Sequence, residues 1–173
     1  MLRSQLLVSL SIAMAVGAFA QSLASGAEAV PGRNEQDARA IRALLAYGFE
    51  ESWNSHHPAT ALTSDKCADP AIFINTSGGW VKGCRALVDL LTPRHAPGGP
   101  SHEHTRRHAV EDLRFIRPDV AIAVVKTFDI RIAGVPTPGR ETRGLVVLVK
   151  EGERWKVTAN QNSTIQASPA GNR

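Results

Sequence analysis

The first half of the chain has the spacing of apolar residues that is typical of helices. Small and apolar side chains recur every three or four positions across residues 38–53, which predicts an amphipathic helix of about five turns. Asn34 lies just before this stretch and is a candidate N-cap. Shorter helices are expected at residues 58–64 and at residues 84–91, the latter ended by Pro93.

The second half changes to the two-residue alternation of β-strands. Residues 71–75 and 80–83 flank the turn sequence Thr76-Ser77-Gly78-Gly79, which predicts a β-hairpin. Beyond a loop rich in proline and glycine, four longer strands are expected, at residues 102–116, 120–132, 142–150 and 155–165. Helices followed by strands predict an α+β fold, in which the N-terminal helices pack on a curved antiparallel sheet as a conical roll. The inner space of such a cone can hold a ligand.

Residues 1–20 have the layout of a secretory signal peptide. Arg3 supplies a positive charge, an apolar run follows, and Ala18-Phe19-Ala20 is a small-x-small cleavage site. An uncleaved anchor is the alternative, which we disfavour because the apolar run is short for a membrane span. We therefore expect a secreted or periplasmic protein with no stable membrane span after cleavage. The expected organisation is a signal peptide at 1–20, a flexible leader at 21–33, one domain at 34–165 and a disordered tail at 166–173.

Export to an oxidising space changes how the two cysteines are interpreted. Cys67 and Cys84 flank the predicted hairpin. If the register of the hairpin is extended to its base, the two cysteines lie nearly opposite each other. A disulfide between them would stabilise the fold by roughly 2–3 kcal/mol. Two free thiols buried as small apolar side chains are an equally good interpretation. Metal binding by this pair alone is much less favoured.

The composition is that of an ordinary globular protein. Of the 173 residues, 43% are hydrophobic and 21% are charged, which argues against a coiled coil or a disordered chain. The net charge of +4 is small and the basic residues are scattered, so nucleic acid is not an expected partner. Aromatic residues make up 5% of the chain, so an apolar pocket must be lined mostly by aliphatic side chains.

Several segments together resemble a known superfamily. In their order along the chain, Trp53-Asn54-Ser55-His56, Phe73-Ile74-Asn75 and Gly79-Trp80-Val81-Lys82-Gly83 resemble the SnoaL-like branch of the nuclear transport factor 2-like superfamily. DLRFIRPDVA at 112–121 and WKVTANQNS at 155–163 resemble the group labelled SgcJ/EcaC oxidoreductases. The resemblance covers about residues 34–165 and implies a cystatin-like conical fold, an apolar cavity and frequent homodimers. It implies function only weakly, because this fold hosts isomerases, cyclases, dehydratases and binding proteins.

Two enzymatic interpretations of the resemblance find little support among the residues. No G-x-G-x-x-G sequence follows a predicted strand, and the sequence has no P-loop, haem or flavin signature, so we expect no cofactor. Steroid isomerases of the superfamily use a carboxylate base, and the resemblance places the equivalent position near Asn75, whose amide is not a base. The single tyrosine, Tyr47, lies away from the apolar stripe of its helix. Ketosteroid-type isomerisation is therefore rejected.

Polar groups that face the cone are the remaining candidates for a ligand site. Regular alternation along the last strand places Gln161 on the same face as Trp155 and Val157, so we expect it to point inward. The candidate ligand-binding residues are Phe49, Trp53, Asn75, Trp80 and Gln161. The alternative is that these residues are packing aromatics and satisfied core amides, and it is favoured for each residue taken singly.

His102, His104 and His108 form the most conspicuous group of titratable side chains. They alternate along one predicted strand, an arrangement that can chelate zinc or copper ions. His56 at the end of the first helix is a further possible ligand. Arg106 shares the face of the three histidines and would repel a cation. A solvated strand face is therefore favoured, and the histidines remain weak metal candidates.

The sequence favours an exported SnoaL-like domain that binds a small apolar or amphipathic molecule in its cone. One alternative is a cofactor-independent lyase, cyclase or isomerase, or an oxidoreductase as the SgcJ/EcaC label implies. A second alternative is a metal-binding or structural dimer of the cell envelope. The expected partners are a small-molecule ligand and a second copy of the chain, and no catalytic residue is assigned.

Overall fold

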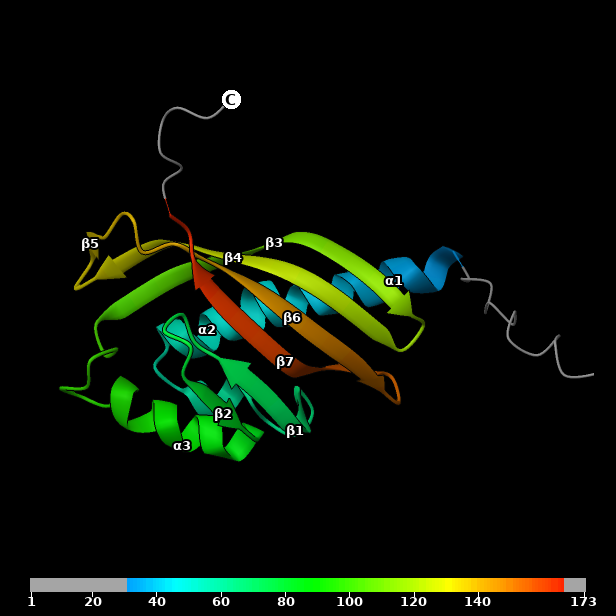
Figure 1. The fold of residues 1–173 in the computed structure, drawn as a ribbon, viewed down its shortest axis with the longest axis horizontal. Helices are drawn as coiled ribbons and strands as arrows, with labels where there is room; N and C mark the ends of the chain where they lie inside the picture. The colour runs from blue at the N-terminus through cyan, green and yellow to red at the C-terminus, as the bar shows by residue number, and fades with distance from the viewer. Residues whose placement is uncertain (1–30, 167–173) are drawn as a thin grey trace, which may run out of the picture.

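The amphipathic stretch forms one long helix with an irregular middle. In the computed structural model, which describes residues 31–166, α1 (Pro31–Arg42) continues through the π-helical segment η1 (Ala43–Gly48) into α2 (Phe49–Asn54). Figure 1 shows this long helix running along one face of the sheet. Its buried apolar side chains therefore pack against the strands, as the helical period of the sequence predicts.

The helix begins three residues before Asn34, the predicted N-cap. Proline is favoured in the first turn of a helix because the N–H that it lacks has no intrahelical partner there, which accounts for the start at Pro31. The predicted leader therefore ends earlier than residue 33. The predicted signal peptide, most of the leader and the predicted tail from residue 167 onward lie outside the described residues.

Two shorter helices follow. The segment predicted as a helix at 58–64 contains a single 3₁₀ turn, η2 (Pro58–Ala61). The helix α3 (Cys84–His95) continues past Pro93, where the sequence predicted its end. A proline this close to the C-terminus of a helix removes only one helical hydrogen bond, and the N–H of Ala96 still donates to the carbonyl of Thr92. None of the helices within residues 31–166 is long and apolar enough to cross a membrane.

The strands form one curved sheet in the order β2-β1-β7-β6-β4-β3, with β5 paired to β4. β1 runs parallel to β7, so the sheet is mixed rather than wholly antiparallel as the sequence predicted. Alternation within a strand carries no information about this pairing, which joins the first and last strands of the domain. In chain order the strands are β1 (Cys67–Ile74), β2 (Trp80–Lys82), β3 (His104–Arg117), β4 (Val120–Ile132), β5 (Val135–Pro136), β6 (Thr142–Glu151) and β7 (Arg154–Thr164).

The core lies between the long helix and the inner face of the sheet. Ala121, Ala123 and Val125 of β4 are buried on that face, beside Val146 and Leu148 of β6. The small alanine side chains leave space for the larger apolar side chains of the helix. Val120, Ile122 and Val124 of β4 alternate with these buried residues and face the opposite side of the sheet, where they are only partly buried.

The predicted hairpin and the predicted disulfide are both present. β1 pairs with β2 so that Ile72 lies opposite Lys82. Cys67 and Cys84 form a disulfide, with their Cα atoms 6.1 Å apart. The disulfide joins the first residue of β1 to the first residue of α3, and it therefore fixes α3 beside the hairpin.

A buried ion pair fixes the long helix to the sheet. The ammonium nitrogen of Lys150 on β6 lies 2.8 Å from a carboxylate oxygen of Asp37 on α1. The two side chains are only 7% and 9% exposed. Lys150 also lies 3.5 Å from the carboxylate of Glu153, which is largely exposed. Burial removes water from the charged groups of Lys150 and Asp37. The attraction between the two charges must therefore offset much of the free energy lost with that water.

Replacing Lys150 by methionine is expected to lower the free energy of unfolding by about 3 kcal/mol, because the buried Asp37 carboxylate loses this cation. The matched control is Arg85→Met, which breaks an ion pair to Asp89 whose side chains are 84% and 57% exposed. The control should cost less than about 1 kcal/mol. Urea denaturation followed by circular dichroism measures both losses, and equal losses would contradict the structural role of the buried pair.

Candidate functional site

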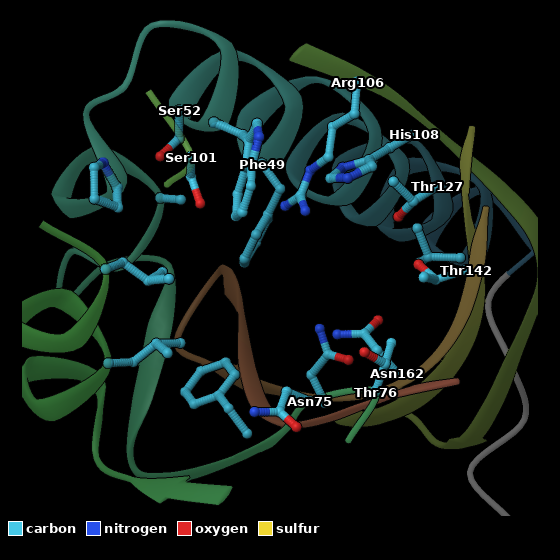
Figure 2. A pocket seen from close by; sticks show the side chains of 18 of the residues that line it. Phe49, Ser52, Asn75, Thr76, Ser101, Arg106, His108, Thr127, Thr142 and Asn162 are labelled. Carbon is cyan, nitrogen blue, oxygen red and sulfur yellow. The ribbon is translucent and has the colours of Figure 1, made fainter. Parts of the chain in front are cut away.

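The cone encloses a cavity of about 470 Å³. It lies between the long helix, α3 and the inner face of the sheet (Figure 2). Much of its wall is apolar, with Leu45 and Phe49 from the helix, Phe73 from β1, and Val125 and Val146 from the sheet. Among the described residues that line the cavity, none is an aspartate or a glutamate. A cavity of this size can hold a small organic molecule.

A β-bulge in β7 decides which amides face the cavity. The pairing with β6 shifts between Val147 and Leu148, where β7 carries one extra residue. An extra residue reverses the alternation of the side chains that follow it. Asn160 and Asn162 therefore line the cavity, whereas Gln161 is exposed. The expectation that Gln161 points inward is wrong for this reason.

Gly144 of β6 leaves room for the two inward-facing amides. It lies opposite Asn162, and a Cβ atom placed on it would be 2.5 Å from Oδ1 of Asn162 and 3.3 Å from Oδ1 of Asn160. The amides thus occupy space that a side chain on β6 would otherwise fill. Oδ1 of Asn160 is buried and has no hydrogen-bond partner among the described residues.

Three of the predicted ligand-binding residues, Phe49, Trp53 and Asn75, line the cavity. The amide of Asn75 also holds the hairpin turn. Its Oδ1 accepts hydrogen bonds from the backbone N–H of Gly79 and from both the backbone N–H and the hydroxyl of Ser77, each at 3.0 Å. The two aromatic side chains therefore form the wall, while Asn75 shapes the loop at its edge.

Trp80 does not face the cone. It is 65% exposed, and its neighbour Val81 lines the cavity in its place. Successive residues of a strand point to opposite faces, so only one of these two side chains can turn inward. The expectation that Trp80 lines the same space as the other candidates is therefore wrong.

Arg106 of β3 projects into the cavity, as Figure 2 shows. Its guanidinium carbon lies 3.4 Å from the centroid of the Trp53 ring, which is a cation–π contact. The backbone N–H of Arg106 donates to Oδ1 of Asn54, and Nδ2 of Asn54 donates to the carbonyl of Arg106, both at 2.9 Å. Two consecutive residues of α2 therefore position this arginine.

The charge of Arg106 has no acidic partner within residues 31–166. Burial is the only cause that lowers the pKa of its guanidinium, to about 9, so the group stays protonated at pH 7. Its Nε atom is buried without a hydrogen-bond partner. Glu50 reaches β3 from α2, but its carboxylate accepts a hydrogen bond from the backbone N–H of His108 at 2.8 Å.

His108 lies two residues beyond Arg106 and faces the same space (Figure 2). Burial and then the positive charge of Arg106 lower the pKa of His108 to about 3, against a hydrogen bond with the backbone of Leu45 that raises it. The imidazole is therefore neutral at pH 7, and its buried Nδ1 atom has no hydrogen-bond partner in the part of the chain that the structure describes. Thr127 and Thr142 add hydroxyl groups on the same side of the cavity.

The three histidines named as weak metal candidates do not come together. His104 and His108 line the cavity on either side of Arg106. His102 precedes β3, and its Nδ1 lies 2.9 Å from the carbonyl oxygen of His95. Across residues 31–166, no group of three or more histidine, cysteine, aspartate or glutamate side chains could hold a metal ion.

His95 of α3 packs behind Trp53. It is 2% exposed, its ring meets Trp53 edge-on with the centroids 4.3 Å apart, and its Nδ1 lies 3.3 Å from Nδ1 of His56. Burial, then His56, and then Arg106 lower the pKa of His95 to about 4, with smaller effects from Arg94 and His104. The ring is therefore neutral at pH 7, like that of His108.

Arg106, Asn160 and Asn162 were not predicted as site residues. An arginine between two histidines on one strand face was the available signal for Arg106, and the sequence analysis used it only as an obstacle to a metal ion. For the two asparagines the sequence carries no comparable signal, because the bulge that turns them inward depends on the pairing with β6.

Solved structures share the fold of the chain, although no protein-family profile and no curated protein matches it. A domain of unknown function with a cystatin-like fold from Nostoc punctiforme is 19% identical, with a TM-score of 0.68 over 76% of this chain and 79% of that chain. An NTF2-like protein with a cystatin-like fold from Novosphingobium aromaticivorans is 14% identical, with a TM-score of 0.64 over 81% and 89%. A hexachlorocyclohexane dehydrochlorinase, LinA-type3, from Novosphingobium barchaimii is 14% identical, with a TM-score of 0.61 over 82% and 96%.

The chain therefore has the cystatin-like fold of NTF2-like proteins, as the sequence resemblance implied. Identities below 20% show a shared fold and do not transfer an activity. The finer resemblance to the SgcJ/EcaC group stays a prediction.

Stability below neutral pH should depend on His95. An unfolded histidine has a pKa near 6.5, whereas the pKa of His95 in the folded protein is about 4. Between these values the unfolded chain binds more protons than the folded chain, so the free energy of unfolding falls as pH falls from about 6.5 to about 4. The slope of the free energy of unfolding against pH reports the difference in bound protons between the two states. Replacing His95 by glutamine should reduce that difference by up to about one proton.

The matched control for this experiment is His57→Gln, which removes a histidine whose side chain is exposed. Urea denaturation at a series of pH values gives the slope independently of any constant loss of stability. A slope for His95→Gln that equals the slope of the wild type would contradict the buried, neutral state of His95.

Proposed function

From this fold and its cavity, we propose that the protein binds a small amphipathic molecule inside the cone. The observation that carries the proposal is the cavity of about 470 Å³, whose largely apolar wall contains buried polar atoms that have no hydrogen-bond partner within residues 31–166. Small-molecule sites are usually apolar clefts with a few fixed polar groups. Buried polar atoms without partners are rare in folded proteins, and a ligand that bonds to them would account for their presence here.

Binding has more support than catalysis. Removal of a proton from a substrate needs a base, and among the described residues that line the cavity none is an aspartate or a glutamate. The pKa of His108 is about 3, so its ring would hold a proton weakly at pH 7. Burial and then Arg140 also lower the pKa of His104. A cofactor-independent lyase, cyclase or isomerase is therefore the weaker alternative.

Export of the protein is part of this proposal. Residues 1–20 have the charge, apolar run and cleavage site of a signal peptide. The disulfide between Cys67 and Cys84 is of a kind that persists in oxidising compartments. A secreted or periplasmic binding protein is consistent with both features.

Binding can be measured with N-phenylnaphthylamine, a neutral apolar dye whose fluorescence rises in apolar surroundings. The wild type should bind it saturably. Replacing Leu90, which lines the cavity and is 45% exposed, by tryptophan should narrow the opening and weaken dye binding by about tenfold. The matched control is Val135→Trp on β5, because Val135 is 64% exposed and lies outside the cavity lining.

The control should bind the dye as the wild type does. Equal weakening in the two variants, or the absence of saturable binding to the wild type, would contradict a ligand site in the cone. Native mass spectrometry of protein purified from its own host then shows whether an organic mass remains bound, and a bound metal mass would favour the histidines instead.

We also propose that two copies associate through the uncovered face of the sheet. The long helix covers only one face of the strands in Figure 1. Val124 of β4 and Leu145 of β6 lie opposite each other on the other face, and Leu145 is 49% exposed. An apolar sheet face can pair with itself about a two-fold axis, which is the commonest symmetry of homodimers.

Sedimentation velocity over a range of concentrations tests the dimer. Replacing Leu145 by lysine should raise the dimer dissociation constant by at least about tenfold, because it places a charge in the apolar interface. Tyr47→Lys is the control, since Tyr47 is 73% exposed on the long helix and away from this face. If the wild type stays monomeric at the highest concentration, the proposed dimer is contradicted.

A further inference from the structure

The buried guanidinium of Arg106 is a feature that a purely apolar ligand would leave unexplained. A charge in an apolar cavity is costly unless an opposite charge or several hydrogen bonds compensate it. Within residues 31–166 no carboxylate pairs with Arg106, and its Nε atom is buried without a partner. The Trp53 ring contacts the guanidinium through its π face, which compensates only part of the charge.

Arg106 is held in place by the protein itself. Asn54 bonds both backbone groups of Arg106 at 2.9 Å, and Trp53 stacks against its guanidinium at 3.4 Å. A side chain that is already fixed loses little conformational freedom when it binds a ligand. This arrangement favours recognition of a planar anionic group, because the guanidinium presents its N–H groups in a rigid fork.

Neutral hydrogen-bonding groups surround the same part of the cavity. Figure 2 shows Arg106, His108, Thr127 and Thr142 together along one side of it. The threonine hydroxyl groups can donate hydrogen bonds to an anion. Phe49 projects into the space beside them and supplies apolar surface (Figure 2).

The exposed charges that line the cavity have the same sign as Arg106. Arg94 of α3 and Arg140, just before β6, both line the cavity and are exposed. Positive charges near an opening raise the local concentration of anions. Because these two side chains remain in contact with water, they contribute less to holding a bound anion than a buried group does.

From these observations we infer that the ligand is an amphipathic carboxylate, with its carboxylate group on Arg106 and its apolar body against Phe49, Phe73 and Val146. The inference rests on the proposed function and adds the chemical class of the ligand. A carboxylate matches a guanidinium through two parallel hydrogen bonds. A phosphate monoester carries close to two negative charges, more than one buried guanidinium neutralises.

Displacement of bound N-phenylnaphthylamine by decanoate, decanol and decyl phosphate tests the inference. Decanoate and decanol have similar apolar chains, so their difference reports the contribution of the carboxylate. In the wild type, decanoate should bind about 10- to 100-fold more tightly than decanol, the factor expected for hydrogen bonds to a charged group. Arg106→Gln should abolish this preference by weakening the binding of decanoate.

The matched control is Arg107→Gln. Arg107 is the next residue on β3, is exposed, and lies over Phe128 with its guanidinium carbon 5.6 Å from the ring centroid. This variant loses the same charge outside the cavity and should keep the full preference for decanoate. Arg106→Lys keeps the charge without the planar fork, so it should retain a smaller preference even if Arg106→Gln does not fold.

Equal affinities of the wild type for decanoate and decanol would overturn the carboxylate class and leave the proposed function standing. Tighter binding of decyl phosphate than of decanoate would assign a phosphorylated ligand and also overturn the inference. An unchanged preference in Arg106→Gln and Arg106→Lys would remove Arg106 from the site. If the dye itself does not bind saturably, the proposed function fails instead.

Discussion

The attachment of the long helix to the edge strand β3 is the constraint on which the site depends. β3 is the last strand of the sheet, so one side of its backbone has no neighbouring strand. α2 supplies the missing partners, since Asn54 bonds both backbone groups of Arg106 and Glu50 accepts a hydrogen bond from the N–H of His108. An uncovered strand edge invites pairing with other chains, and here polar side chains of a helix cover part of it. The same contacts bring the helix and sheet together around the cavity and fix the two residues that face it.

Burial has different consequences for the basic side chains around this cavity. It lowers the pKa of Arg106 to about 9, of His95 to about 4 and of His108 to about 3. Because the ordinary pKa of a histidine is near 6.5, the two histidines become neutral at pH 7, whereas the ordinary pKa of an arginine is so much higher that Arg106 stays charged. The buried positive charge therefore resides on one planar group, with neutral imidazole rings near it.

The elements that the sequence predicted well are those defined by local signals. The hairpin follows from the turn residues between two alternating segments, and β4 (Val120–Ile132) matches the predicted strand at both ends. Gln161 was misplaced because alternation assumes one residue opposite one residue, and the bulge in β7 breaks that rule. Arg106 was undervalued because its importance lies in the absence of a carboxylate near it, and such an absence becomes visible only when the wall of the cavity is assembled in three dimensions.

The disulfide also limits the shape of the cavity. α3 contributes three leucine side chains to the wall. Its first residue, Cys84, is bonded to β1, and its last residue, His95, packs against Trp53, so this part of the wall is held at both ends. The start of α3 is also held by hydrogen bonds to β1, from the N–H of Gly83 to the carbonyl of Ala71 and from the N–H of Cys84 to the carboxylate of Asp69, both at 2.7 Å. The space open to a ligand therefore depends in part on a covalent bond between two residues that do not themselves line the cavity.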